Sequence, residues 1–219
     1  KQVVYALGHL GPGMLTQFIT TWLLLFLTGN ADSPILSGTL VGTAMLFGRI
    51  MDAVSDPIVA NWSDNFKGKR FGRRLPFMLL GTLPMIVCFL AIWLTPNVVK
   101  TEVARFIWLF VFLNGFYFFY TMVVNTYFAL LPEIAASDKQ RIFIQSFVSL
   151  FGILGMGTAL GASGFLINAL GYFGAGLAMS VFCAVVMMIP AAVIKVNPDY
   201  VAPPAPNQTD NVIKNIIGA

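Results

Sequence analysis

Charged residues are scarce in this chain of 219 residues. Lysine, arginine, aspartate and glutamate make up 10% of it, whereas hydrophobic residues make up 58% and the mean hydropathy is +0.81. Soluble domains usually carry about 25% charged residues. The composition therefore excludes an ordinary soluble domain and indicates a polytopic membrane protein.

Cysteine and histidine are also scarce, with two and one residues respectively. Cys88 and Cys183 lie in apolar runs, where a small buried thiol is expected rather than a disulfide or a metal ligand. His9 cannot form a metal cluster alone; it is either an interface residue or a pH-sensitive group. The sequence contains no Ser/His or His/Glu arrangement typical of an enzyme. We therefore expect no enzymatic activity, no prosthetic cofactor and no metal site beyond a possible Na+.

Six apolar runs are long enough to cross a bilayer, whose hydrocarbon core of about 30 Å takes about 20 helical residues. Gly, Pro, Asn and Asp punctuate the segments between them. The predicted spans are residues 4–28, 35–62, 76–94, 103–131, 142–170 and 172–194. This pattern predicts an all-α membrane protein with six transmembrane helices.

Basic residues gather in alternate connections between these runs. One side holds Lys67, Lys69, Arg70, Arg73, Arg74, Lys139, Arg141 and Lys195, and the other holds only Lys100 and Arg105. Cytoplasmic loops of membrane proteins carry this excess of lysine and arginine. The bias places both chain ends in the cytoplasm. The expected location is the plasma membrane, that is, a bacterial inner membrane. It also accounts for the net charge of +4 without a nucleic-acid partner.

The second apolar run contains three charged residues, Arg49, Asp52 and Asp56. In a helix their spacing places all three on one face. Each would cost about 2.5–3.5 kcal/mol in a membrane unless paired or hydrated. One interpretation is a buried ion-pair network that locks helices together. The other is a site for Na+ or a proton, in which Ser55 adds an oxygen and Arg49 offsets part of the negative charge.

Glycines in the fifth run have two interpretations. Gly157, Gly161 and Gly164 follow helical spacing and could let a neighbouring helix approach closely. They could also mark a flexible gating helix. The two interpretations are compatible, and close packing is the one we expect.

A basic loop follows the second run, from Asp64 to Pro76. Its glycines allow a tight turn and its cations can cap the preceding helix. It is either an ordinary cytoplasmic loop or a gating loop. The candidate gating residues are Asp64, Gly68, Lys69, Arg70, Arg73 and Arg74.

At these residues the chain resembles known transporters. Asp64-x-x-x-Gly68-Lys69-Arg70 resembles the loop between the second and third helices of major facilitator transporters. The segment 48–57 resembles the signature of the glycoside–pentoside–hexuronide:cation symporters, the melibiose-permease branch. Tyr120-Thr121 and the segment 130–141 also match that branch. The resemblance implies the N-terminal six-helix half of a twelve-helix carrier, built from two inverted three-helix repeats.

The resemblance also implies roles for individual residues. Asp52, Ser55, Asp56 and Thr121 fall where that branch binds its coupling cation, Na+ or H+. Its sugar-recognising charges fall at apolar or small residues here, so the polar clamp on a sugar is lost or moved. The residues that we expect to line a substrate cavity are Gln17, Tyr117, Tyr120, Asn125, Phe128 and Ser149. Hydrogen bonding or packing between helices is the alternative role for these side chains.

Two units are expected along the chain. Residues 1–196 form the six-helix bundle, and residues 197–219, with four prolines and then a short amphipathic pattern, form a cytoplasmic linker. Because the chain begins at Lys1 without a methionine, we expect residues before it, and we expect a second six-helix half after Ala219.

The predicted function is cation-coupled symport of a sugar or glycoside by alternating access. The expected partners are a small-molecule substrate, membrane lipid and the missing second half. Transport of an amphipathic lipid, such as a lysophospholipid, is the first alternative. A non-transporting membrane subunit for assembly or partner binding is the second.

Overall fold

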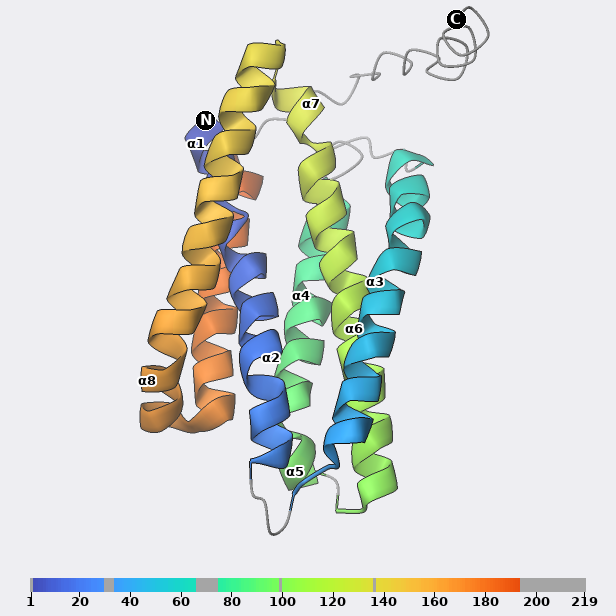
Figure 1. Ribbon diagram of the computed structural model, residues 1–219. Helices are drawn as coiled ribbons and strands as arrows, with labels where there is room; N and C mark the ends of the chain where they lie inside the picture. The colour runs from blue at the N-terminus through green and yellow to red at the C-terminus, as the bar shows by residue number, and fades with distance from the viewer. Residues whose placement is uncertain (1, 30–33, 66–74, 99, 136, 194–219) are drawn as a thin grey trace, which may run out of the picture.

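The computed structural model describes residues 2–29, 34–65, 75–98, 100–135 and 137–193, and these residues fold into helices joined by short connections (Figure 1). The predicted linker, residues 197–219, lies outside the described residues. The helices are α1 (Gln2–Leu7), α2 (Leu10–Thr28), α3 (Gly38–Asn65), α4 (Leu75–Trp93), α5 (Thr95–Val98), α6 (Glu102–Ala129), α7 (Leu131–Ile134) and α8 (Asp138–Val193).

The longest helix, α8, folds back on itself at Gly171. This glycine has φ 72° and ψ 175°, a conformation that side-chain-bearing residues rarely adopt. The two limbs of α8 therefore run in opposite directions beside each other (Figure 1). They correspond to the fifth and sixth predicted spans, which the sequence separated at the same place.

The prediction of an all-α membrane protein is confirmed. Four helical stretches of the described chain are long and apolar enough to cross a membrane: Gln2–Thr28, Pro76–Trp93, Glu102–Ala129 and Asp138–Pro190. Helix α3 is 28 residues long but is not among them, and it is the helix that carries Arg49, Asp52 and Asp56. The count of six spans stays a prediction.

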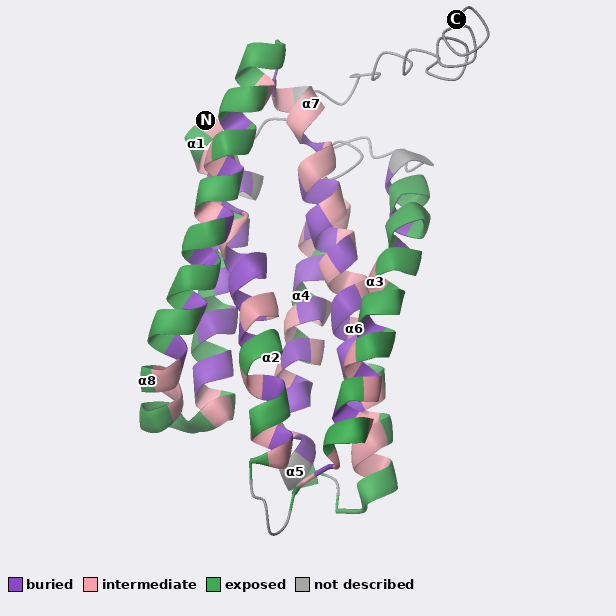
Figure 2. Ribbon diagram, in the orientation of Figure 1, coloured by how far each residue is buried: buried purple, intermediate pink, exposed green. Residues whose placement is uncertain are grey.

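The outer surface of the bundle is strongly apolar. Figure 2 shows exposed residues along α3 and both limbs of α8, and buried residues concentrated where the helices face one another. Large exposed side chains include Leu46 and Trp62 on α3 and Ile153 and Phe165 on α8. Soluble monomers rarely expose apolar patches of this extent, so these faces suit lipid or another membrane helix.

Packing between the helices divides the bundle into two contacting groups. Helix α2 packs mainly on α8, α6 packs on both α3 and α4, and α4 also contacts α8. Aromatic rings join the groups near the Gly171 turn. Trp93 of α4 stacks on Tyr172 with ring centroids 6.0 Å apart, and Phe18 of α2 makes an edge contact with Trp93 with ring centroids 4.8 Å apart. Such ring pairs stabilise by about 0.5–1.5 kcal/mol beyond the area that they bury.

Two tyrosines fasten α1 to the end of α6. The rings of Tyr5 and Tyr127 stack at 4.4 Å. The Tyr5 hydroxyl donates to the Tyr127 carbonyl at 2.6 Å, and the Tyr127 hydroxyl donates to the Tyr5 carbonyl at 2.5 Å. Each ring therefore satisfies a backbone oxygen of the other helix. His9, at the break before α2, packs on Phe128 at 5.0 Å.

The close approaches of α8 lie at different glycines from those predicted. A Cβ atom at Gly152 would come within 2.8 Å of His9 Cδ2, and one at Gly155 would meet the Leu10 backbone. At Gly157 and Gly161 no described atom lies within 4 Å of an added Cβ. Within the described chain, the close-packing interpretation is therefore wrong for Gly157 and Gly161. Those two glycines face outward, away from the helices of this bundle.

Candidate functional site

Helices α3 and α6 run in the same direction and pair in one constant register. Gly48 faces Tyr117, Asp52 faces Thr121 and Asp56 faces Asn125, with an offset of 69 residues in each hydrogen-bonded pair. Steps of four residues place one pair on each successive turn of both helices. We call these three pairs the ladder, and each pair a rung.

The second and third rungs each hold a carboxylate against a neutral donor. Thr121 Oγ1 donates to Asp52 Oδ1 at 2.5 Å, and Asn125 Nδ2 donates to Asp56 Oδ1 at 2.9 Å. Hydrogen bonds to an ionised acceptor are short and stronger than neutral ones. Each carboxylate is thus oriented by the opposite helix, and its second oxygen has no hydrogen bond from another side chain in the described part of the chain.

The ladder opens progressively along α3. Gly48 and Tyr117 are buried, and Tyr117 is 1% exposed. Asp52 is half-buried against Thr121, which is 2% exposed, whereas Asp56 is exposed and Asn125 is half-buried. Among the described residues, the ladder is therefore most exposed at its Asp56 end.

Arg49 and Ser55 flank the carboxylates without contacting their side chains in the described structure. The Arg49 guanidinium lies 5.0 Å from the centre of the Tyr117 ring, a cation–π contact, and it forms no ion pair with Asp52 or Asp56. The Ser55 hydroxyl donates to the Asp52 backbone carbonyl at 3.0 Å. Each carboxylate consequently accepts from a neutral donor of its own, and the arginine lies to one side.

These groups fit a small hard cation. Two carboxylates and the oxygens of Thr121 and Asn125 lie on adjacent turns, and hard cations prefer oxygen ligands. The described residues hold no group of three or more His, Cys, Asp or Glu side chains that could hold a metal ion. The arrangement therefore places two carboxylates and further oxygen atoms on two adjacent turns of an apolar bundle.

The residues predicted to line a substrate cavity are dispersed. Gln17 donates to Thr21 at 3.0 Å on α2, Tyr117 is enclosed in the ladder and Phe128 packs on His9. Tyr120 is half-buried and Asn125 belongs to the third rung. The pairing of Asn125 with Asp56 was not predicted from the sequence. It could have been, because Asp56 and Asn125 lie four positions beyond Asp52 and Thr121, which the family resemblance had already placed together.

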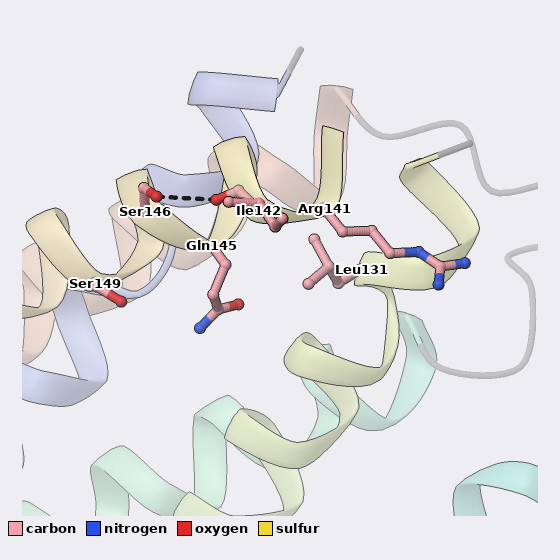
Figure 3. A pocket seen from close by; sticks show the side chains of 6 residues that line it. All are labelled: Leu131, Arg141, Ile142, Gln145, Ser146 and Ser149. Carbon is pink, nitrogen blue, oxygen red and sulfur yellow. Dashed lines mark hydrogen bonds between the residues drawn. The ribbon is translucent and has the colours of Figure 1, made fainter. Parts of the chain in front are cut away.

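Ser149 lines a separate cavity of about 400 Å³ at the start of α8. Its other lining residues are Leu131, Arg141, Ile142, Gln145 and Ser146 (Figure 3). Figure 3 shows Gln145 projecting from α8 into this space and Arg141 extending past Leu131. Sequence reasoning missed Gln145, although Arg141, Gln145 and Ser149 recur every four residues on one helical face.

The proposed gating loop lies almost entirely outside the described residues. Residues 66–74 and the side chain of Asp64 lie outside the described residues, and this includes Gly68, Lys69, Arg70, Arg73 and Arg74. Their role stays a prediction.

The apolar helices and the polar side chains between α3 and α6 define the class: a polytopic helical membrane protein with a polar site between its helices. Residues 4–217 match the family model described as MFS/sugar transport protein. The chain belongs to this family, and the resemblance drawn from its motifs is confirmed.

Curated relatives agree with this assignment. An uncharacterized symporter of Synechocystis sp. is 34% identical over 70% of this chain and 28% of its own length. The sodium-dependent lysophosphatidylcholine symporter 1-A of Danio rerio is 26% identical over 73% of this chain and 29% of its own. The isoprimeverose transporter of Lactiplantibacillus pentosus is 25% identical over 87% and 39%. The chain thus spans well under half of the length of these relatives.

Proposed function

We propose that this chain is the cation-binding half of a secondary active transporter that carries a sugar or glycoside together with Na+ or H+. The observation that carries the proposal is the pair of oriented carboxylates, Asp52 held by Thr121 and Asp56 held by Asn125. A structural ion-pair network would place Arg49 on a carboxylate. Instead its cation lies on the Tyr117 ring.

Coupling follows from the energetics of these charges. Two carboxylates one turn apart repel each other in a medium of low dielectric constant. A bound cation neutralises part of this charge and stabilises the conformation in which the oxygens converge. A ligand shifts a conformational equilibrium by its difference in affinity for the two states. The cation would thereby favour the state that binds substrate, with alternating access between the two halves.

The proposed topology has six spans that cross the inner membrane of a bacterium, and both chain ends lie in the cytoplasm. Residues 1–196 would form this half, and residues 197–219 would lead to a second six-helix half. The family relatives, two to three times longer than this chain, support a second half. The first and last described helical turns lie at the same end of the bundle, in line with an even number of spans (Figure 1). No catalytic centre or prosthetic cofactor is part of the proposal.

A lysophospholipid is the second candidate substrate. A relative carries the name of a sodium-dependent lysophosphatidylcholine symporter. The described bundle also has an apolar cavity of about 310 Å³ between α2 and α8, lined by Leu10, Met14, Thr158, Ala162, Leu166, Ala178, Met179 and Phe182. Such a cavity suits an acyl chain better than a sugar.

Uptake by the full-length protein in vesicles tests the proposal. Asp52→Asn and Asp56→Asn keep the shape of each side chain and remove its charge. We expect each variant to lose the dependence of uptake on a Na+ or proton gradient. Asn168→Asp, an exposed amide-to-acid change on α8, controls for altered charge. Wild-type cation dependence in both aspartate variants would refute the assignment, and a panel of sugars and lysolipids separates the two substrate candidates.

A further inference from the structure

One polar group on the third rung has no partner in the ladder. Asn125 donates from Nδ2 to Asp56 Oδ1 at 2.9 Å, and its carbonyl oxygen accepts no recorded hydrogen bond from the described residues. An asparagine side chain carries its donor and its acceptor on one planar group. One N–H of Asn125 is occupied, and its acceptor has no partner among the described residues.

The position of Asn125 differs from that of Thr121. The Thr121 hydroxyl is buried and closed against Asp52. Asn125 is half-buried and faces Asp56, the exposed member of the pair. A cation that arrives from the open end of the ladder therefore meets Asp56 and Asn125 before Asp52.

We propose that Asn125 is a specificity-determining residue of the cation site. Its amide nitrogen fixes the orientation of Asp56, and its carbonyl oxygen coordinates the ion. This inference rests on the proposed function and moves Asn125 from the substrate cavity to the cation site.

The expected consequence is discrimination by ion size. Selectivity between ions of one charge depends on the size of the cavity and on the number of ligands and their flexibility. A neutral carbonyl oxygen attached to the group that holds Asp56 adds a ligand at a fixed position and adds no charge. Its loss should change affinity unequally for Na+ and Li+. If Asn125 served only to fasten α3 to α6, its replacement would lower stability and leave the ratio of the two affinities unchanged.

Ion titrations of the purified full-length transporter test this role. Na+ and Li+ are added at fixed pH against choline, without substrate, and binding is followed by intrinsic tryptophan fluorescence and by the melting temperature. We expect Asn125→Ala to raise the apparent Kd for Na+ by about tenfold or more. We also expect it to change the Na+/Li+ ratio by about threefold or more, since a selectivity ratio is a difference between two binding free energies. Asn125→Ser, which keeps a shorter oxygen and donor, should fall between Asn125→Ala and wild type.

The controls separate this inference from the proposed function. Asn168→Ala removes an exposed amide of α8 and should change neither the affinity nor the ratio. An Asn125→Ala protein with wild-type affinity and ratio overturns the inference and leaves the proposed function standing. If Asn125→Ala does not fold, the same criterion applies to Asn125→Ser. A wild-type protein that responds to neither ion also overturns the inference, whereas the proposed function is judged by uptake in the aspartate variants.

Discussion

The first rung fixes how closely α3 and α6 can approach. A Cβ atom at Gly48 would lie 2.6 Å from Cδ2 of Tyr117, about 0.8 Å inside the 3.4 Å at which ordinary contact begins. The Tyr117 ring is enclosed, with Phe116 at 5.4 Å and the Arg49 guanidinium at 5.0 Å from its centre. Because the ring has little room to move, Gly48→Ala must push the two helices apart.

The cost can be bounded from two opposing effects. Overpacking a filled interior destabilises by about 1–3 kcal/mol. Replacing a glycine inside a helix by alanine gains about 0.5–1 kcal/mol. We therefore expect Gly48→Ala to lower the free energy of unfolding by at most about 2.5 kcal/mol. The hydrogen bond from Thr121 to Asp52 lies one turn further on, so the same separation should weaken Na+ binding.

Thermal unfolding of the full-length protein, with and without Na+, measures both effects. Gly42→Ala is the matched control, because it makes the same change in the same helix at a site with no described atom within 4 Å of the new Cβ. It should leave the melting temperature unchanged or raise it, and it should keep the shift caused by Na+. Equal melting temperatures and equal Na+ shifts for the two variants would show that the first rung does not limit the helix separation.

Two further predictions concern stability. Tyr5→Phe and Tyr127→Phe each remove one of the two reciprocal hydrogen bonds between α1 and α6. Each variant should lower the free energy of unfolding by about 0.5–1.5 kcal/mol. A melting temperature at the wild-type value would contradict this prediction. Gly171→Ala places a side chain at φ 72° and should destabilise by about 1–3 kcal/mol. Gly157→Ala is its control, since an added Cβ meets open space there, and equal melting temperatures for these two variants would argue against backbone strain at the turn.

Most helix boundaries could be predicted from the sequence. The third predicted span, 76–94, corresponds to α4 at 75–93, and the fourth, 103–131, corresponds to α6 at 102–129. Membrane helices need a minimum apolar length, and Gly, Pro and polar residues mark their ends clearly. The break at Gly8–His9 and the one-turn helices α5 and α7 were not predicted. Each of these features changes the helices by about a single turn. The prediction averaged hydrophobicity over about 20 residues, and such an average does not detect a single turn.

The site was predictable only in part, because sequence gives the face of a helix but not its neighbour. The charged face of α3 followed from spacing alone, and the nearness of Thr121 to Asp52 followed from the family resemblance; the contact is present. That these residues bind a cation stays a prediction. Tyr117 was expected in a cavity and is enclosed instead, because an aromatic run covers every face of a helix and only packing decides which rings are accessible.

The ladder also explains why a charged pair can persist in this apolar bundle. At its closed end, Gly48 and the Tyr117 ring bring two parallel helices together through packing, and the Arg49 guanidinium lies on the same ring. This separation lets two short neutral side chains on α6 reach two carboxylates on α3. A hydrogen bond to a polar atom offsets part of the cost of removing that atom from water. The apolar rung and the polar rungs therefore act as one unit, so a change in packing at Gly48 should alter the affinity of a site that it does not touch.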